Sequence, residues 1–344
     1  MFVQMGRHTV CVCACKLRCI IPLLKPSRRF MSPHSNEMSG NSRQSAPISI
    51  ARVRQLFSRT ERVAESQFLR REISGRMFER LALIKANPLL IVDAGCGEGE
   101  DLLPLHQLFP HASLLGVDAS SAMLSKARAV AASTKSAMSR IFNTVLGRLR
   151  PAPGSAMLGC ADFARLPLEA GSVDLIWSNL ALHWHPQPDL IFAEWRRVMR
   201  VDGLLMFSCF GPDSFRQLRE AFVSVGENHA VLPFVDLHDF GDMLVDAGFS
   251  TPVMDMEILN ITYSSTEKLL GDLRAIGGNP LITRRRSLWG RKKWVQLMDA
   301  LERQRGPDGL INLTIEVIYG HAFRPVQTKT ASGESIIKFD LKRK

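Results

Sequence analysis

Residues 89–99 combine an acidic side chain with a run of glycines, a pattern that suits the binding of a nucleotide-like ligand. They read Leu-Leu-Ile-Val-Asp-Ala-Gly-Cys-Gly-Glu-Gly, so an apolar stretch ends at Asp93 and glycines follow at positions 95, 97 and 99. Glycines let the backbone turn tightly and approach a ligand without a Cβ clash. The N–H groups at the start of the next helix, expected over 99–108, would face an anionic group of that ligand.

A nicotinamide-type phosphate loop is the obvious competitor, and the spacing argues against it. That fingerprint needs Gly-x-Gly-x-x-Gly, in which the third glycine stands five positions after the first. Counted from Gly95, that position is Glu100. The loop therefore favours a different ligand.

Further polar residues follow the next apolar stretches. Asp118 ends the stretch 114–118, at the distance of roughly 20 residues from a glycine loop at which an acid accepts hydrogen bonds from ribose hydroxyls. Asp162 and Phe163 follow the next stretch, and Asn179 follows the one after it. Taken singly, Asp118 could be a helix cap and Asp162 a turn residue. The order and spacing of all these residues favour one shared ligand site instead.

This series resembles the motifs of the class I S-adenosylmethionine-dependent methyltransferases, beginning with motif I at Asp93. The resemblance implies S-adenosylmethionine as the cofactor. It places Asp162 at the adenine amino group, Phe163 beside the adenine ring, and the strand before Asn179 beside the sulfonium. The cofactor contacts that it implies are Asp93, Gly95, Cys96, Gly97, Gly99, Asp118, Ala119, Asp162, Phe163 and Asn179.

Longer segments resemble the malonyl-acyl-carrier-protein O-methyltransferases of biotin synthesis, the BioC family. The chain reads Ser-Asn-Leu-Ala-Leu-His-Trp from residue 178, Gly-Pro-Asp-Ser from 211 and Tyr-Gly-His-Ala from 319, within a similarity that covers 50–325. This family methylates the free carboxylate of a malonyl thioester, which implies malonyl-acyl-carrier protein, or alternatively malonyl-CoA, as the substrate and an acyl carrier protein as partner. The chain departs from the family at Val63–Glu65, where many relatives carry a Tyr-Asp pair that closes over the cofactor.

Methylation of a carboxylate demands little of the side chains. A carboxyl group with a pKa of about 4 is already ionised at neutral pH and needs no general base. The rate should depend on holding the carboxylate in line with the methyl group in a dry site. We expect Arg216 and Arg219 to anchor the acceptor carboxylate, and the other expected lining residues of the acceptor pocket are His183, Trp184, Tyr319 and His321.

A run of cations between 284 and 293 predicts a docking surface for the carrier protein. Such a run is otherwise only a solvated surface, but a basic patch beside a pocket would steer an acidic partner towards it. The expected docking residues are Arg284, Arg285, Arg286, Arg291, Lys292 and Lys293.

The elements that must position these residues alternate along the chain, which predicts an α/β fold. Expected strands at 89–93, 114–118, 156–160, 173–178 and 203–210 are interleaved with helices at 99–108, 120–132 and 188–199. We therefore expect a Rossmann-like class I methyltransferase sheet of seven mostly parallel strands, with helices on both faces.

Helical patterns flank this core. Helices are expected over 48–84, from Pro212–Asp213 onward and over 238–248. Two last strands, 252–263 and one within 310–323, enclose 264–309, a helical insertion that opens with the capping-box pattern Ser264-x-x-Glu267. We expect this insertion to act as a lid over the strand ends where ligands bind in such sheets.

Composition limits the remaining classes. The 344-residue chain has a formal net charge of +11, but residues 1–50 hold seven Lys or Arg and one acid, so the charge is weak support for nucleic-acid binding. Four of the seven cysteines stand at 11, 13, 15 and 19 without a matching second cluster. This pattern predicts neither a disulfide framework nor a metal site. It favours a reducing compartment, and we therefore expect a cytoplasmic location.

The two ends are expected to lie outside the folded domain. Residues 1–48 predict a disordered basic tail, a presequence or a start placed too far upstream, with Met31 and Met38 as alternative starts. Lys16 and Arg18 interrupt the apolar runs, so no transmembrane span fits. We expect a methyltransferase domain over 49–325, a surface connection over 133–155 and a flexible tail over 326–344.

Three other functions stay open on the sequence. The chain could methylate another small carboxylate or a quinone precursor on the same fold. It could be a respiratory-complex assembly factor, since relatives of that kind share Ser-Asn-Leu-x-Leu-His-Trp. A nucleic-acid methyltransferase is disfavoured, because Asn179-Leu180-Ala181-Leu182 stands where amino-group methylases carry Asn-Pro-Pro-aromatic. We therefore expect no nucleic-acid or membrane partner.

Overall fold

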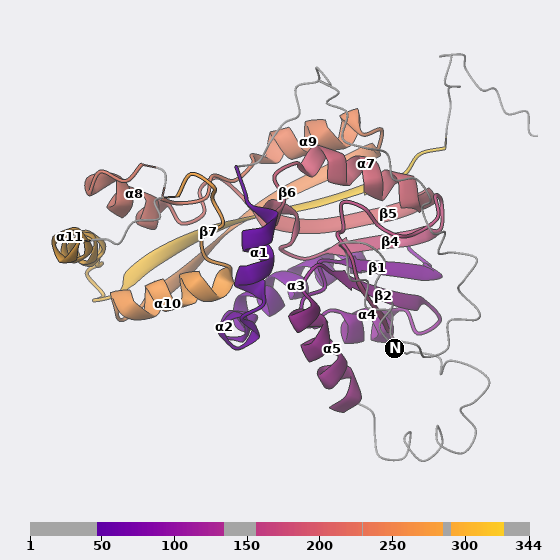
Figure 1. The fold of residues 1–344 in the computed structure, drawn as a ribbon. Helices are drawn as coiled ribbons and strands as arrows, with labels where there is room; N and C mark the ends of the chain where they lie inside the picture. Colours follow the sequence, from indigo (N-terminus) through magenta and orange to yellow (C-terminus); the bar gives the residue numbers. More distant parts are fainter. Residues whose placement is uncertain (1–46, 134–155, 229, 285–289, 327–344) are drawn as a thin grey trace, which may run out of the picture.

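The computed structural model describes residues 47–133, 156–228, 230–284 and 290–326, which form a seven-stranded sheet flanked by helices (Figure 1). The spatial strand order is β3-β2-β1-β4-β5-β7-β6. β7 runs antiparallel to both of its neighbours, whereas the other paired strands are parallel. This arrangement confirms the expected Rossmann-like sheet. The strands are β1 (Leu90–Ala94), β2 (Ser113–Asp118), β3 (Met157–Cys160), β4 (Val173–Ser178), β5 (Met199–Phe210), β6 (Ser250–Tyr263) and β7 (Ile311–Phe323).

Helices cover both faces of the sheet, and three more gather around one end of the long β6–β7 pair (Figure 1). Those three are α8, α10 and α11, of which α10 and α11 lie between β6 and β7 in the chain. The helices are α1 (Ile50–Phe57), α2 (Thr60–Ala64), α3 (Gln67–Ala82), α4 (Leu102–Leu108), α5 (Ser121–Ser133), η2 (Leu182–Trp184), α7 (Pro188–Val198), α8 (Arg216–Ser224), α9 (Leu237–Asp246), α10 (Thr266–Ile276) and α11 (Arg291–Glu302).

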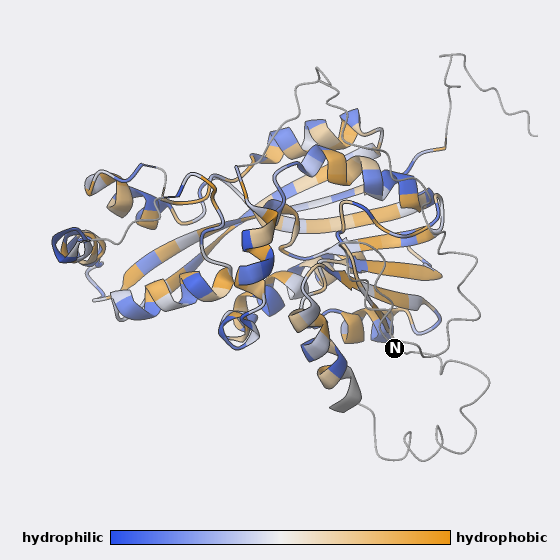
Figure 2. Cartoon of the chain, in the orientation of Figure 1, coloured by the Kyte–Doolittle hydropathy of each residue, from blue (hydrophilic) through white to orange (hydrophobic). Residues whose placement is uncertain are grey.

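Two apolar layers hold the sheet between its helices. Successive side chains of a strand point to opposite faces. In β1, Ile91 belongs to the layer that contains Ile73 of α3, while Val92 belongs to the layer that contains Phe192 of α7 and Phe240 of α9. The strands of the sheet centre are accordingly hydrophobic along most of their length (Figure 2). This packing fixes the carboxyl ends of β1, β2 and β4 as a rigid platform.

Several element boundaries differ from the sequence expectation. The glycine loop continues through Gly99, so α4 begins at Leu102 rather than at 99. Pairing with β4 starts β5 at Met199 rather than at 203. α8 begins at Arg216 because Phe215, with φ +61°, breaks the helix that was expected from Pro212. The cap of α10 is Ser265 rather than Ser264, since its side chain accepts a hydrogen bond from the Lys268 N–H.

The N-terminal residues are tied to the insertion by a short antiparallel pairing, which we call the strap. The Ser49 N–H donates to the Pro280 carbonyl at 3.1 Å, and the Ile282 N–H donates to the Pro47 carbonyl at 2.9 Å. A second link runs from the Ser66 hydroxyl to the Ala275 carbonyl at 3.1 Å. The strap therefore joins the start of α1 to the segment that follows α10, above the carboxyl edge of the sheet.

Candidate active site

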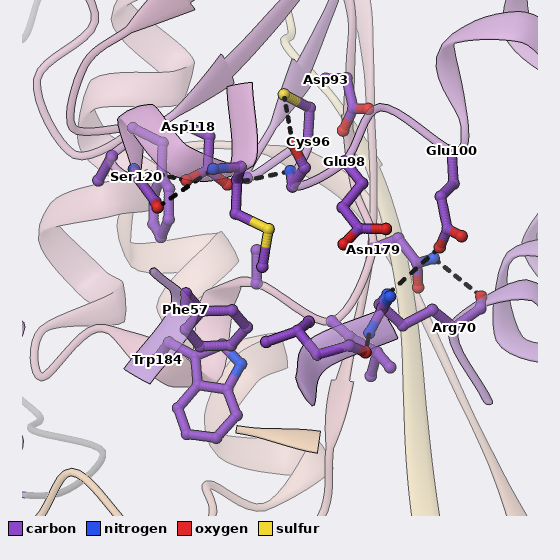
Figure 3. A pocket seen from close by; sticks show the side chains of 18 of the residues that line it. Phe57, Arg70, Asp93, Cys96, Glu98, Glu100, Asp118, Ser120, Asn179 and Trp184 are labelled. Atoms are coloured by element: carbon purple, nitrogen blue, oxygen red, sulfur yellow. Dashed lines mark hydrogen bonds and ion pairs between the residues drawn. The ribbon is translucent and has the colours of Figure 1, made fainter. Parts of the chain in front are cut away.

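A cavity of about 830 Å³, including its open mouth, lies at the carboxyl ends of β1, β2 and β4. It is bounded by the glycine loop, by α1 and by α3 (Figure 3). Eight of the ten residues expected at the cofactor line it, and Gly99 and Asp162 do not. The eight are Asp93, Gly95, Cys96, Gly97, Asp118, Ala119, Phe163 and Asn179.

The glycine loop needs its glycines for two different reasons. Gly95 has φ +85°, and a Cβ at this position would lie 2.3 Å from the Ala181 Cβ, so the loop packs directly against the chain that follows β4. Gly97 has φ +52° with no atom near its Cβ direction. Gly99 leaves the cavity and packs near Leu102 and Ala127 instead. The loop is thus shaped by close packing at one end and by backbone conformation in its middle.

The N–H groups of this loop are largely used within the protein. The N–H groups of Gly95 and Cys96 both donate to the Val117 carbonyl, at 2.8 and 3.0 Å. The Gly97 N–H donates to the Asp118 carboxylate at 3.0 Å. Because α4 starts only at Leu102, a helix N-terminus directly after the glycines, which the sequence pattern predicted, is not found. An anionic part of a ligand needs another partner.

Arg70 on α3 offers that partner, and no sequence motif marked it. Its Nη1 donates to the Val63 carbonyl at 3.0 Å and to the Ser66 hydroxyl at 2.8 Å, and its Nε lies 3.3 Å from a Glu100 oxygen. Its Nη2 is buried and has no hydrogen-bond partner among the residues that the structure describes. Arg70 lines the cavity opposite Asp118 (Figure 3), so its guanidinium brings a positive charge to the side where an anionic group could lie.

Asp118 sits at the end of β2 and braces the loop. Its two carboxylate oxygens accept from the N–H groups of Gly97 and Ser120, at 3.0 and 2.7 Å. A carboxylate offers about four acceptor positions, so it can still accept from ligand hydroxyls. Burial raises the pKa of Asp118 despite these two hydrogen bonds.

Three buried acids lie together at the cavity, and each adds a negative charge there when it is ionised. Burial raises the pKa of Asp93 well above its ordinary value, and the charges of Asp101 and Asp118 raise it further. Burial also raises the pKa of Asp101, which accepts from the Ser74 hydroxyl at 2.6 Å and the Trp177 indole at 2.8 Å. A cationic ligand would relieve the mutual repulsion of these carboxylates.

Asp162 and Asn179 act differently from the sequence expectation. Asp162 lies outside the cavity lining, where its carboxylate is 3.6 Å from Arg54 of α1. Asn179 does line the cavity, but its amide nitrogen donates to the Arg70 carbonyl and to Asp101, and its oxygen accepts from the Ser208 hydroxyl. Both residues therefore fix the walls of the cavity.

A second, larger cavity of about 1790 Å³, including its opening, lies among α8, α10 and α11. Trp184 lines both cavities, and its ring lies 5.3 Å from that of Phe57 on α1. The second cavity is walled mainly by apolar side chains, and its cations are Arg274 and Arg284. The apolar and aromatic lining residues include Phe215, Leu218, Phe222, Val231, Leu232, Phe234, Leu270, Leu273, Ile276, Trp294 and Leu297.

The expected anchors of the acceptor carboxylate do not line either cavity. On α8, Leu218 and Phe222 face the second cavity at a helical spacing of four. Arg216 and Arg219 fall on other sides of the same helix; Arg216 is exposed, and Arg219 donates to the Ser214 carbonyl at 3.2 Å. Helix phase therefore separates these arginines from the cavity.

The expected acceptor residues on β7 are also displaced. β7 runs away from the carboxyl edge, so Tyr319 pairs with Ser208 and His321 pairs with Met206, inside the sheet. The Arg80 guanidinium lies 3.9 Å above the Tyr319 ring. His321 packs beside Phe323. Neither side chain lines a cavity.

His183 is a buried core residue, although its neighbour Trp184 lines both cavities. Its Nδ1 accepts from the Phe210 N–H at 3.4 Å, and its ring lies against those of Phe210 and Phe234. Burial lowers the pKa of His183 to about 3, so the imidazole is neutral at physiological pH. His183 therefore packs behind the aromatic side chains that line the second cavity, among them Trp184 and Phe234.

The basic run divides between the second cavity and the surface. Arg284 lines the cavity, whereas Arg291 and Lys292 are exposed at the start of α11. Lys293 pairs with Glu227 at 2.7 Å. Arg285 and Arg286 lie outside the described residues, as do most of the N-terminal segment, the four cysteines at 11–19 and the C-terminal tail after 326. Among the described helices, none combines the length and apolar character that a membrane span requires.

Comparison with known proteins gives one consistent picture. A family model described as a methyltransferase domain matches residues 92–207. A malonyl-[acyl-carrier protein] O-methyltransferase of Gallionella capsiferriformans is 40% identical over 294 residues, which cover 85% of this chain and 97% of that protein. One of Laribacter hongkongensis is 42% identical over 295 residues, which cover 84% and 95%.

A solved structure shares the fold at lower sequence identity. The YcgJ protein of Bacillus subtilis superposes with a TM-score of 0.50 and 15% identity, covering 75% of this chain and all of that one.

Proposed function

The chain belongs to the family of malonyl-[acyl-carrier protein] O-methyltransferases, which use S-adenosylmethionine, and we propose that it methylates the free carboxylate of a malonyl group carried by an acyl carrier protein. One observation carries this proposal beyond the family name. An acid-lined cavity at the strand ends and an apolar cavity within the insertion meet at Trp184. Two ligands can thus approach one another from opposite sides of a single indole ring.

The residues of the first cavity fit S-adenosylmethionine. Its sulfonium is a cation, which the ionised forms of Asp93, Asp101 and Asp118 would attract. Its methionine carboxylate matches the unpaired Nη2 of Arg70. Its ribose hydroxyls match the remaining acceptor positions of Asp118, and its adenine suits the apolar wall that includes Phe163 and Met123.

The chemistry requires positioning rather than proton transfer. The bound cofactor supplies an electrophilic methyl group. The acceptor carboxylate is ionised near neutral pH, so no side chain needs to remove a proton. This agrees with His183, which is neutral and lies behind the wall. Trp184 and Phe57 exclude water where the two cavities meet, and a dry, aligned geometry can account for much of the rate.

The size of the second cavity favours an acceptor on a long arm. A malonyl group has only three carbons, whereas the cavity extends from Trp184 to Trp294 and Arg284. Apolar walls suit the thioester and the flexible arm that links it to a carrier. In this proposal residues 264–309 act as a lid that is closed over the arm, and the exposed Arg291 and Lys292 meet the acidic carrier surface.

Mass spectrometry of the carrier protein tests the proposal. Purified protein with S-adenosylmethionine and malonyl-carrier protein should add one CH₂, a gain of about 14 daltons on the carrier, the signature of one methyl transfer. Acetyl-carrier protein is the matched control because it lacks the free carboxylate, and it should gain nothing. An unchanged malonyl species, or an equal gain on the acetyl species, would contradict the proposed reaction.

A further inference from the structure

Three arginines come together where the strap joins α1 to the insertion. The strap places Ser49 beside Pro280 and Pro47 beside Ile282. Arg52 follows in the first turn of α1, and Arg284 stands two residues beyond Ile282 on the wall of the second cavity. Arg59, just after α1, lies close enough to repel Arg52.

These charges are not balanced within the described part of the chain. Burial lowers the pKa of Arg52, and the positive charges of Arg284 and Arg59 lower it further. The Nε of Arg52 is buried and lacks a hydrogen-bond partner among the described residues, while its Nη1 is held by Gln55 at 2.6 Å. Glu227, the acid that lines the second cavity, is already paired with Lys293 at 2.7 Å. Because the positive charges of these arginines repel one another, the binding of an anion among them would be favourable.

The cluster is displaced from the reacting end of the cavity. Phe57 at the end of α1 contacts Trp184, where the cavities meet. Arg52 is five residues earlier, which is about 7.5 Å along a helix axis. Arg52 is therefore better placed to hold an anion further along the acceptor than the carboxylate that reacts beside Trp184.

We propose that Arg52 and Arg284, supported by Arg59, bind the phosphate of the phosphopantetheine arm that carries the malonyl group. The inference rests on the proposed function, because that function supplies an acceptor whose thioester is followed by a phosphodiester. A phosphate accepts several hydrogen bonds at once and suits guanidinium donors. Binding it would also neutralise the repulsion across the strap and hold α1 against the insertion.

Calorimetry with two soluble arm analogues tests this site without methyl transfer. The protein is saturated with S-adenosylhomocysteine and titrated with 4′-phosphopantetheine or with pantetheine, which lacks the phosphate. We expect the wild type to bind the phosphorylated probe about tenfold more tightly, the size of effect typical of hydrogen bonds to a charged group. In an Arg52→Gln, Arg284→Gln double variant this preference should fall to about twofold or less.

Controls separate the site from general effects of charge and folding. Arg303→Gln removes an exposed cation at the end of α11 that lines neither cavity, and it should keep the full preference. The affinity for S-adenosylhomocysteine reports whether the double variant is folded, and Arg284→Gln alone provides a milder test. No preference in the wild type, or a preference that survives in the double variant, would overturn the inference.

An equal loss of affinity for both probes in the double variant would also overturn the inference, because it would mean that the arginines maintain the shape of the cavity and do not bind the phosphate. The proposed reaction stands or falls separately, since it is judged by the mass gain on malonyl-carrier protein. A chain that methylates the carrier but ignores the phosphate refutes only this site.

Discussion

At the scale of single residues, we expect Arg70 to contribute directly to the binding of S-adenosylmethionine. Its buried Nη2 has no partner among the described residues, and a hydrogen bond to a charged group contributes about 1.5–3 kcal/mol. Arg70→Gln should therefore weaken binding of S-adenosylmethionine about tenfold or more in calorimetry. Arg71→Gln is the matched control, because Arg71 is 67% exposed and faces the same Glu100 at 3.6 Å. An equally large loss in both variants would refute a direct role for Arg70.

The buried acids predict a pH dependence of cofactor binding. Burial raises the pKa values of Asp93, Asp101 and Asp118, so these groups take up protons at a higher pH than ordinary carboxyl groups. Each proton removes a negative charge that favours the sulfonium. The preference for S-adenosylmethionine over the uncharged sulfur of S-adenosylhomocysteine should therefore shrink as pH falls through the raised pKa values of these groups. Calorimetry of both ligands checks this, and a constant preference would contradict it.

The same raised pKa values have the opposite effect on the ligand-free protein. Between the ordinary and the raised pKa values the folded state holds more protons than the unfolded state. By linkage, these groups cost stability as pH rises through that window. Part of this cost should be recovered when the cation binds.

Residue types and spacing predicted most of the lining of the first cavity, but little of the lining of the second. Asp93, Gly95 and Asp118 line the first cavity as expected, because their positions depend on short-range backbone geometry that the sequence displays. Arg70 was missed because an arginine on a helix carries no signal until α3 is packed beside the loop. Arg219 and His321 line neither of the two cavities, because helix phase and strand direction, not nearness in the chain, decide what lines a cavity.

At the scale of elements, the glycine loop predicts a sharp contrast between two substitutions. Gly95→Ala places a Cβ 2.3 Å from the Ala181 Cβ at φ +85°, so strain and overpacking should lower the free energy of unfolding by about 3 kcal/mol. Gly75→Ala on α3 meets no atom within 4 Å and should stabilise the helix by about 0.5–1 kcal/mol. Urea unfolding measures both, and similar effects would contradict the packing argument.

The order of the elements was predictable, and their ends were less so. Hydrophobic patterns gave the alternation of strands and helices because each central strand is buried on both faces. The start of β5 depends on pairing with β4, and the start of α8 depends on the backbone of Phe215. Such contacts join residues that are far apart in the sequence, so a local pattern does not display them.

At the scale of the whole molecule, the described domain should be sufficient for cofactor binding. Every residue that lines either cavity lies at position 53 or later. A chain that starts at Met38 should therefore bind S-adenosylmethionine within about twofold of the full-length affinity. A chain that starts at Arg59 lacks Val53 and Phe57 and should bind much more weakly. Calorimetry of the three proteins checks this, and a large loss in the Met38 chain would contradict it.

The strap has a consequence for the order of events in turnover. The pairing links α1, whose Val53 and Phe57 line the first cavity, to the segment after α10, whose Asn279 and Thr283 line the second. We expect an arm that fills the second cavity to hold this link in place and so to keep the nucleoside in the first cavity. We therefore expect the methyl ester to dissociate first and the nucleoside second. Binding of a new methyl donor is then the last step of each cycle.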